Sequence, residues 1–91
     1  MLTVTDAAGA CLASRLVEKG AGHDAALRFC RRRKRHGWTL RLDKPCPSDA
    51  TFSHEGRIVL VLDEPSSRLL DDRTLDIKQT DKGPRLRLRG L

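Results

Sequence analysis

The spacing of apolar residues near the start of the chain has the period of a helix. Thr5 and Asp6 are residues that can cap a helix N-terminus, and after them apolar residues recur every fourth position, at Ala8, Leu12 and Leu16. Residues at this spacing lie on one face of a helix. The pattern therefore predicts a helix over Ala7–Glu18 that ends before Gly20.

Beyond this helix the period changes to two, which is typical of strands. Leu27 and Phe29 alternate with Arg28 and Cys30, and a second alternating stretch contains Trp38, Leu40 and Leu42. We expect two half-buried strands joined across residues 33–37, with the apolar residues pointing inward and Arg28 on the opposite face.

The second half of the chain predicts two hairpins separated by a short helix. Residues 50–53 and 57–62 flank a turn at residues 54–56, and Ile58–Leu62 is apolar on both faces, as a central strand would be. Asp63 and Pro65 favour a helix start, and this helix should run to Leu70. The order of elements predicts one α+β domain over residues 1–91, with mixed or antiparallel strands.

The last predicted hairpin has the best-defined register. Residues 73–80 and 85–89 flank a turn at residues 81–84. A symmetric turn pairs apolar with apolar and acidic with basic residues along the whole ladder, at Leu75 with Leu88, Ile77 with Leu86, and Asp76 with Arg87.

Composition places the chain among small basic domains. Its 91 residues carry 18 Lys and Arg against 12 Asp and Glu, which gives a net charge of +6. The longest apolar run, Ile58–Leu62, is far shorter than the roughly 18 residues that cross a bilayer. The first residues have no basic or apolar region of a secretion signal. We therefore expect a cytoplasmic protein with no membrane partner.

The densest charge lies between residues 28 and 41, a segment without any acidic residue. Such a run indicates an anion-binding or nucleic-acid-binding hairpin, because Lys and Arg that neutralise phosphates release counterions. Its candidate anion-binding residues are Arg28, Arg31, Arg32, Arg33, Lys34 and Arg35. The alternative is a solvated loop whose charges meet carboxylates from elsewhere, at Asp43, Asp71 or Asp72.

The three cysteines, Cys11, Cys30 and Cys46, form no C-x-x-C pair, which excludes the common zinc motifs. Cations beside Cys30 favour its thiolate form, the form that binds metals. The candidate metal ligands are Cys30, Cys46 and His36. The alternative is a purely structural role for the thiols. No G-x-S-x-G, Walker or G-x-G-x-x-G motif is present. The residues therefore indicate a binding protein that is not an enzyme.

Several stretches in the same order along the chain resemble the HesB/IscA family, the A-type iron–sulfur cluster carriers. They cover residues 2–90 and comprise Leu2–Ala8, Leu27–Phe29, Phe52 with Glu55-Gly56, Val59–Asp63, and Leu69–Asp71 with Leu75–Ile77. The resemblance implies a β-rich distorted sandwich with one long N-terminal helix and one short helix. It also implies a role in iron–sulfur cluster biogenesis, with an assembly protein or a second copy of the chain as partner.

The family binds its cluster through three cysteines, one in a G-C-S-G loop and two in a C-G-C motif. The corresponding loop here, Arg33–Trp38, has no cysteine, and the 91 residues contain no C-G-C. The resemblance thus implies a degenerate, non-enzymatic member for which no cofactor is expected. Two alternatives stay open: anion or nucleic-acid binding by residues 28–41, and iron or cluster binding through Cys30 and Cys46 in an oligomer.

Overall fold

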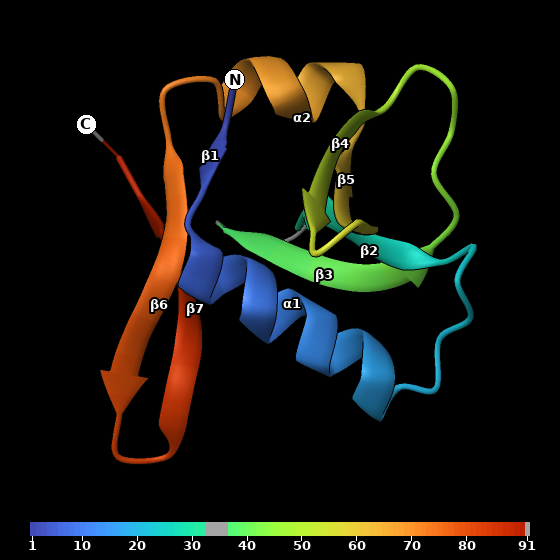
Figure 1. The fold of residues 1–91 in the computed structure, drawn as a ribbon. Helices are drawn as coiled ribbons and strands as arrows, with labels where there is room; N and C mark the ends of the chain where they lie inside the picture. Colours follow the sequence, from blue (N-terminus) through green and yellow to red (C-terminus); the bar gives the residue numbers. More distant parts are fainter. Residues whose placement is uncertain (33–36, 91) are drawn as a thin grey trace.

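A computed structural model describes residues 1–32 and 37–90 (Figure 1). Its elements follow the chain in the order β1 (Thr3–Val4), α1 (Asp6–Glu18), β2 (Ala26–Arg31), β3 (Trp38–Asp43), β4 (Ala50–His54), β5 (Arg57–Leu62), α2 (Glu64–Leu69), β6 (Thr74–Thr80) and β7 (Gly83–Arg89). The predicted α+β class, with one longer and one short helix, is confirmed over these residues.

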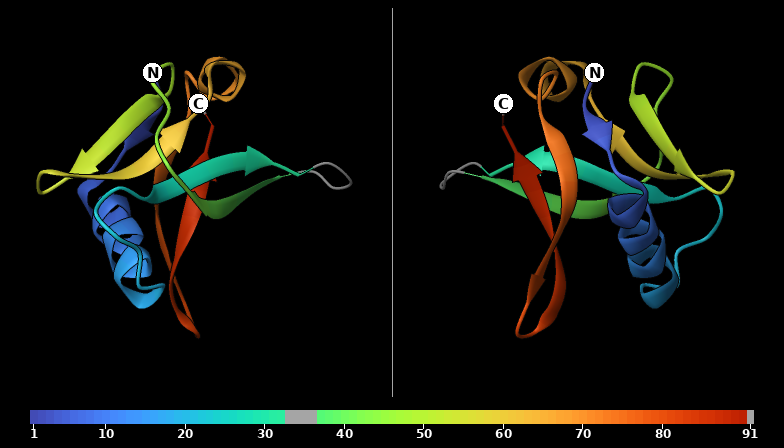
Figure 2. Two further views of the ribbon diagram at one scale, coloured as in Figure 1. Left: turned by 90° about the vertical axis from the view of Figure 1, so that its right-hand side faces the viewer. Right: turned by 60° about the vertical axis from the view of Figure 1, so that its left-hand side comes forward.

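The strands form two sheets, of order β1-β6-β7 and β3-β2-β5-β4. Each sheet is mixed, because β1 pairs in parallel with β6 and β2 pairs in parallel with β5, whereas the three hairpins are antiparallel. Helix α1 lies beside both sheets and contacts β4, β5 and β6 (Figures 1 and 2). The two sheets therefore share one apolar core with the helix.

Helix α1 begins and ends close to the predicted residues. The Thr5 side chain caps it by accepting a hydrogen bond from the Ala8 backbone N–H at 3.2 Å. Ala8, Leu12 and Leu16 are fully buried, as their spacing predicts. Beyond the helix, Gly20 adopts a positive φ of 66°, a conformation that glycine adopts without strain.

The β6–β7 hairpin has the predicted register, with Leu75 opposite Leu88, Ile77 opposite Leu86 and Asp76 opposite Arg87. Its turn is tighter than predicted, because Gly83 and Pro84 already belong to β7. The proline is tolerated in the ladder because β7 is an edge strand.

The two middle strands of the larger sheet, β2 and β5, are the most deeply buried. Residues Val59–Leu62 of β5 are inaccessible on both faces, which confirms the expected central strand. The alternation predicted for β2 is wrong, because Ala26, Leu27, Arg28 and Phe29 are all buried. Residues 44–49, which follow β3, lie over the face of β2 that carries Arg28 and hydrogen-bond to its side chain.

Candidate functional site

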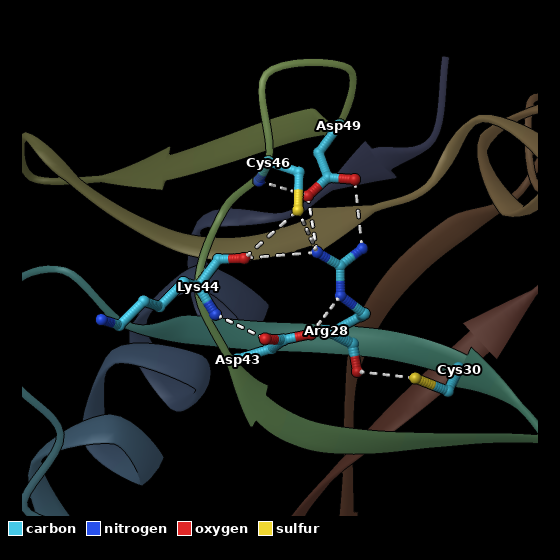
Figure 3. A network of polar contacts seen from close by, with 6 residues as sticks. All are labelled: Arg28, Cys30, Asp43, Lys44, Cys46 and Asp49. Carbon is cyan, nitrogen blue, oxygen red and sulfur yellow. Dashed lines mark hydrogen bonds and ion pairs between the residues drawn. The ribbon is translucent and has the colours of Figure 1, made fainter.

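Arg28 is the centre of a partly buried polar cluster that joins β2 to the end of β3 and to the loop before β4 (Figure 3). Its Nη2 and Nη1 donate to the two carboxylate oxygens of Asp49 at 2.6 and 3.1 Å, and its Nε donates to Asp43 Oδ2 at 2.8 Å. The Arg28 side chain is 10% exposed and that of Asp49 only 3%. Two carboxylates thus surround one buried guanidinium.

Backbone groups of the loop complete the cluster. The Cys46 N–H donates to Asp49 Oδ2 at 2.8 Å, and the Lys44 N–H donates to Asp43 Oδ1 at 2.8 Å. The Lys44 carbonyl oxygen accepts a hydrogen bond from Arg28 Nη2 at 3.3 Å. The loop of residues 44–49 is therefore tied to β2 through one side chain.

The electrostatics of the cluster favour its fully charged form. Hydrogen bonds from Arg28 hold the pKa of Asp49 below its ordinary value. The pKa of Asp43 is lowered mainly by the hydrogen bond from the Lys44 N–H and to a smaller extent by the hydrogen bond from Arg28. Asp49 in turn raises the pKa of Arg28, against the effect of burial. The cluster carries a structural ion pair at neutral pH.

This geometry does not fit the expected role of Arg28 in binding an external anion. Its guanidinium is buried and already bonded to two carboxylates, so a phosphate would have to displace Asp43 or Asp49. The alternative of a solvated loop agrees with the structure only in the ion pair of Arg28 with Asp43, since Arg28 is buried in β2 and also pairs with Asp49.

The two candidate cysteine ligands lie on different sides of Arg28 (Figure 3). Cys30 Sγ is 3.8 Å from the Arg28 carbonyl oxygen, whereas Cys46 Sγ is 3.8 Å from Arg28 Nη2. Cys11 is on α1. No group of three or more potential metal ligands occurs among residues 1–32 and 37–90, and the candidate ligand His36 lies outside them.

The rest of the basic segment is only partly described. Arg31 and Arg32 are exposed, while Arg33, Lys34 and Arg35 lie outside the described residues. The β2–β3 hairpin extends beyond the β6–β7 hairpin in both views of Figure 2. Where it passes β7, Arg32 lines a surface hollow together with Arg15 of α1 and Arg85 of β7. The sequence around Arg15 and Arg85 does not single them out as binding residues, because each lies outside the basic segment of residues 28–41.

Neither helix in the described part of the chain combines the length and apolar character that a membrane span requires. No family model matches the sequence, and no curated protein matches it.

The fold, by contrast, matches solved structures over almost the whole chain. Escherichia coli SufA, which is involved in the biosynthesis of iron–sulfur clusters, superposes with a TM-score of 0.76 and 18% identity over 98% of this chain and 84% of SufA. IscA, solved with its [2Fe-2S] cluster, gives a TM-score of 0.63 and 18% identity over 99% of this chain and 85% of IscA. The chain therefore has the HesB/IscA-like fold.

Proposed function

We propose that this chain is a non-enzymatic protein of iron–sulfur cluster biogenesis that works without a cluster bound through the usual family cysteines. The first half of the proposal is supported by the fold, which both SufA and IscA share over nearly the full chain. We place the protein in the cytoplasm, with an assembly protein or a second copy of itself as partner.

The cysteine positions carry the second half of the proposal. Cluster binding needs several thiolates that converge on the metal. Here the two thiols contact different groups of Arg28: Cys30 Sγ lies near its carbonyl oxygen, and Cys46 Sγ lies near its Nη2. A cluster-free protein with the carrier fold would act by binding its partner.

Anaerobic reconstitution with iron and sulfide tests this proposal, with Escherichia coli SufA as the positive control. We expect no stoichiometric iron or sulfide uptake and no visible absorption from the folded chain. Stable uptake that disappears in Cys30→Ser or Cys46→Ser would overturn the proposal in favour of metal binding by these thiols. Light scattering before and after reconstitution shows whether uptake depends on an oligomer.

Nucleic-acid binding is the second candidate function, favoured by the exposure of Arg31 and Arg32 and by the net charge of +6. Binding through phosphates should weaken steeply with salt. Fluorescence anisotropy with a labelled single-stranded oligonucleotide, at about 50 and 200 mM salt, tests this. A change of all five residues from Arg31 to Arg35 to glutamine should remove the binding, and an affinity independent of salt would refute this function.

A further inference from the structure

Three arginines from separate elements line one hollow of about 290 Å³ on the surface. Arg15 comes from α1, Arg32 directly follows β2, and Arg85 lies on β7. The remaining lining residues are Trp38, Thr39, Leu40 and Leu86, so no carboxylate of residues 1–32 and 37–90 lines the hollow. Its volume is just below the range of ligand pockets, roughly 300–1,000 Å³.

The charges of this hollow are not balanced within the described part of the chain. Neither Arg15, Arg32 nor Arg85 makes an ion pair with a described residue, in contrast to Arg28 and Arg87. Like charges that face one concave site repel one another and focus a positive potential there. An anion bound between the guanidinium groups would relieve this repulsion, and phosphate matches their hydrogen-bonding geometry.

The hollow also offers an aromatic surface next to the charges. Trp38 is half-buried, and its ring packs on Phe29 with the ring centroids 5.3 Å apart. This contact supports the indole ring at the edge of the hollow, where Leu40 and Leu86 add apolar surface. A flat heterocycle can stack on an aromatic side chain while arginines hold the phosphates of the same ligand.

We propose that the hollow binds a free nucleoside polyphosphate. Its phosphates lie between Arg15, Arg32 and Arg85, and its base lies against Trp38. The site shares Arg32 and Trp38 with the segment of residues 28–41, but it also needs Arg15 of α1 and Arg85 of β7, so it does not depend on either candidate function above. The site forms only when α1, β7 and the end of β2 pack together, and its proposed ligand is a small molecule.

The protein contains one tryptophan and no tyrosine, so its intrinsic fluorescence reports on Trp38 alone. We would titrate the chain with ATP at fixed ionic strength, follow Trp38 emission and measure the same affinity by calorimetry. Inorganic tripolyphosphate, which has the phosphates without the base, is the comparison ligand. We expect ATP to quench Trp38 and to bind more tightly than tripolyphosphate.

Variants separate this site from general charge attraction. Arg15→Gln and Arg85→Gln each remove one charge-assisted contact and should raise the Kd for ATP about tenfold. Arg31→Gln is the matched control, because it removes the same charge beside Arg32 without lining the hollow, and it should change the Kd less than about threefold. Circular dichroism of each variant verifies folding.

The affinities of the three variants for ATP decide between the proposed site and general charge attraction. A tenfold loss in Arg15→Gln and Arg85→Gln, with little loss in Arg31→Gln, supports the site. Equal losses in all three variants, or equal affinity for tripolyphosphate and ATP, would overturn it. An absence of ATP binding would also overturn the site. If a single-stranded oligonucleotide binds instead and Arg31→Gln weakens that binding most, the result supports the nucleic-acid function.

Discussion

Replacing Asp49 by asparagine removes one charge from the Arg28 cluster with almost no change in side-chain volume. The asparagine side chain would keep an oxygen that can accept from Arg28, but its amide group would face a donor. The Cys46 N–H would also lose a charged acceptor at 2.8 Å. Arg28 would then remain buried with Asp43 as its one carboxylate partner.

The size of the effect follows from burial. Removing one partner of a buried ion pair typically costs 3–5 kcal/mol, and the remaining Asp43 places the expected loss near the lower limit, at about 3 kcal/mol. Domains of this size are stable by about 5–10 kcal/mol, so the variant should stay folded but lose a large share of its unfolding free energy. Asp43→Asn is the matched control and should cost less, because the Asp43 side chain is 40% exposed.

Urea unfolding followed by circular dichroism measures both variants. We expect the midpoint of Asp49→Asn to fall by about 2 M with an unchanged slope. Combining Asp49→Leu with Arg28→Met removes both charges and should recover part of the loss. The reasoning would be refuted if Asp49→Asn cost no more than Asp43→Asn, or if the double variant were less stable than Asp49→Asn.

Three further predictions concern pH, a close contact and a helix cap. Because Arg28 lowers the pKa of Asp49 in the folded state, the stability from Asp49 is complete above its ordinary value of 3.8 and is lost as the pH falls through the folded value. Urea unfolding from pH 6 to pH 2 should therefore show a steeper loss for the wild type than for Asp49→Asn, and parallel curves would contradict this. In Gly9→Ala the new Cβ would lie 3.0 Å from His54 Nδ1, and this close contact should offset the higher helix propensity of alanine. In the His54→Ala background the same change should raise the unfolding free energy by about 1 kcal/mol. Equal changes in thermal stability in the two backgrounds would disprove the effect of His54. Asp63→Ala removes the acceptor of the Ser66 N–H at 2.9 Å and should cost about 1 kcal/mol in urea unfolding, while a loss of the same size in Asp63→Asn would argue against the cap.

The hairpin β6–β7 could be predicted from the sequence to the exact residue pairs, because its strands are neighbours along the chain and one symmetric turn sets their register. The central position of β5 was also predictable, since Val59–Leu62 has no polar residue that could face water. Both inferences use local patterns. The parallel pairing of β2 with β5 was beyond such patterns, because it depends on how distant segments pack.

The burial of Arg28 shows why alternation alone was insufficient for the site. A period of two separates the faces of a strand but does not report what covers the polar face. Here the cover is the loop that carries Asp49, and this residue is 21 positions beyond Arg28 in sequence. The proposed nucleotide site could not be predicted for the same reason, because Arg15 and Arg85 line the same hollow as Arg32 only through the packing of α1 and β7.

The parallel pairing of β1 with β6 has a consequence for synthesis in the cell. Thr3 and Val4 pair with Thr74 and Leu75, so β1 is synthesised long before the strand with which it pairs. Because synthesis runs from the N-terminus to the C-terminus, the surface of α1 that packs on β6 stays uncovered until β6 has been made. The core between the helix and the smaller sheet is therefore complete only once β6 has been synthesised and has packed on α1.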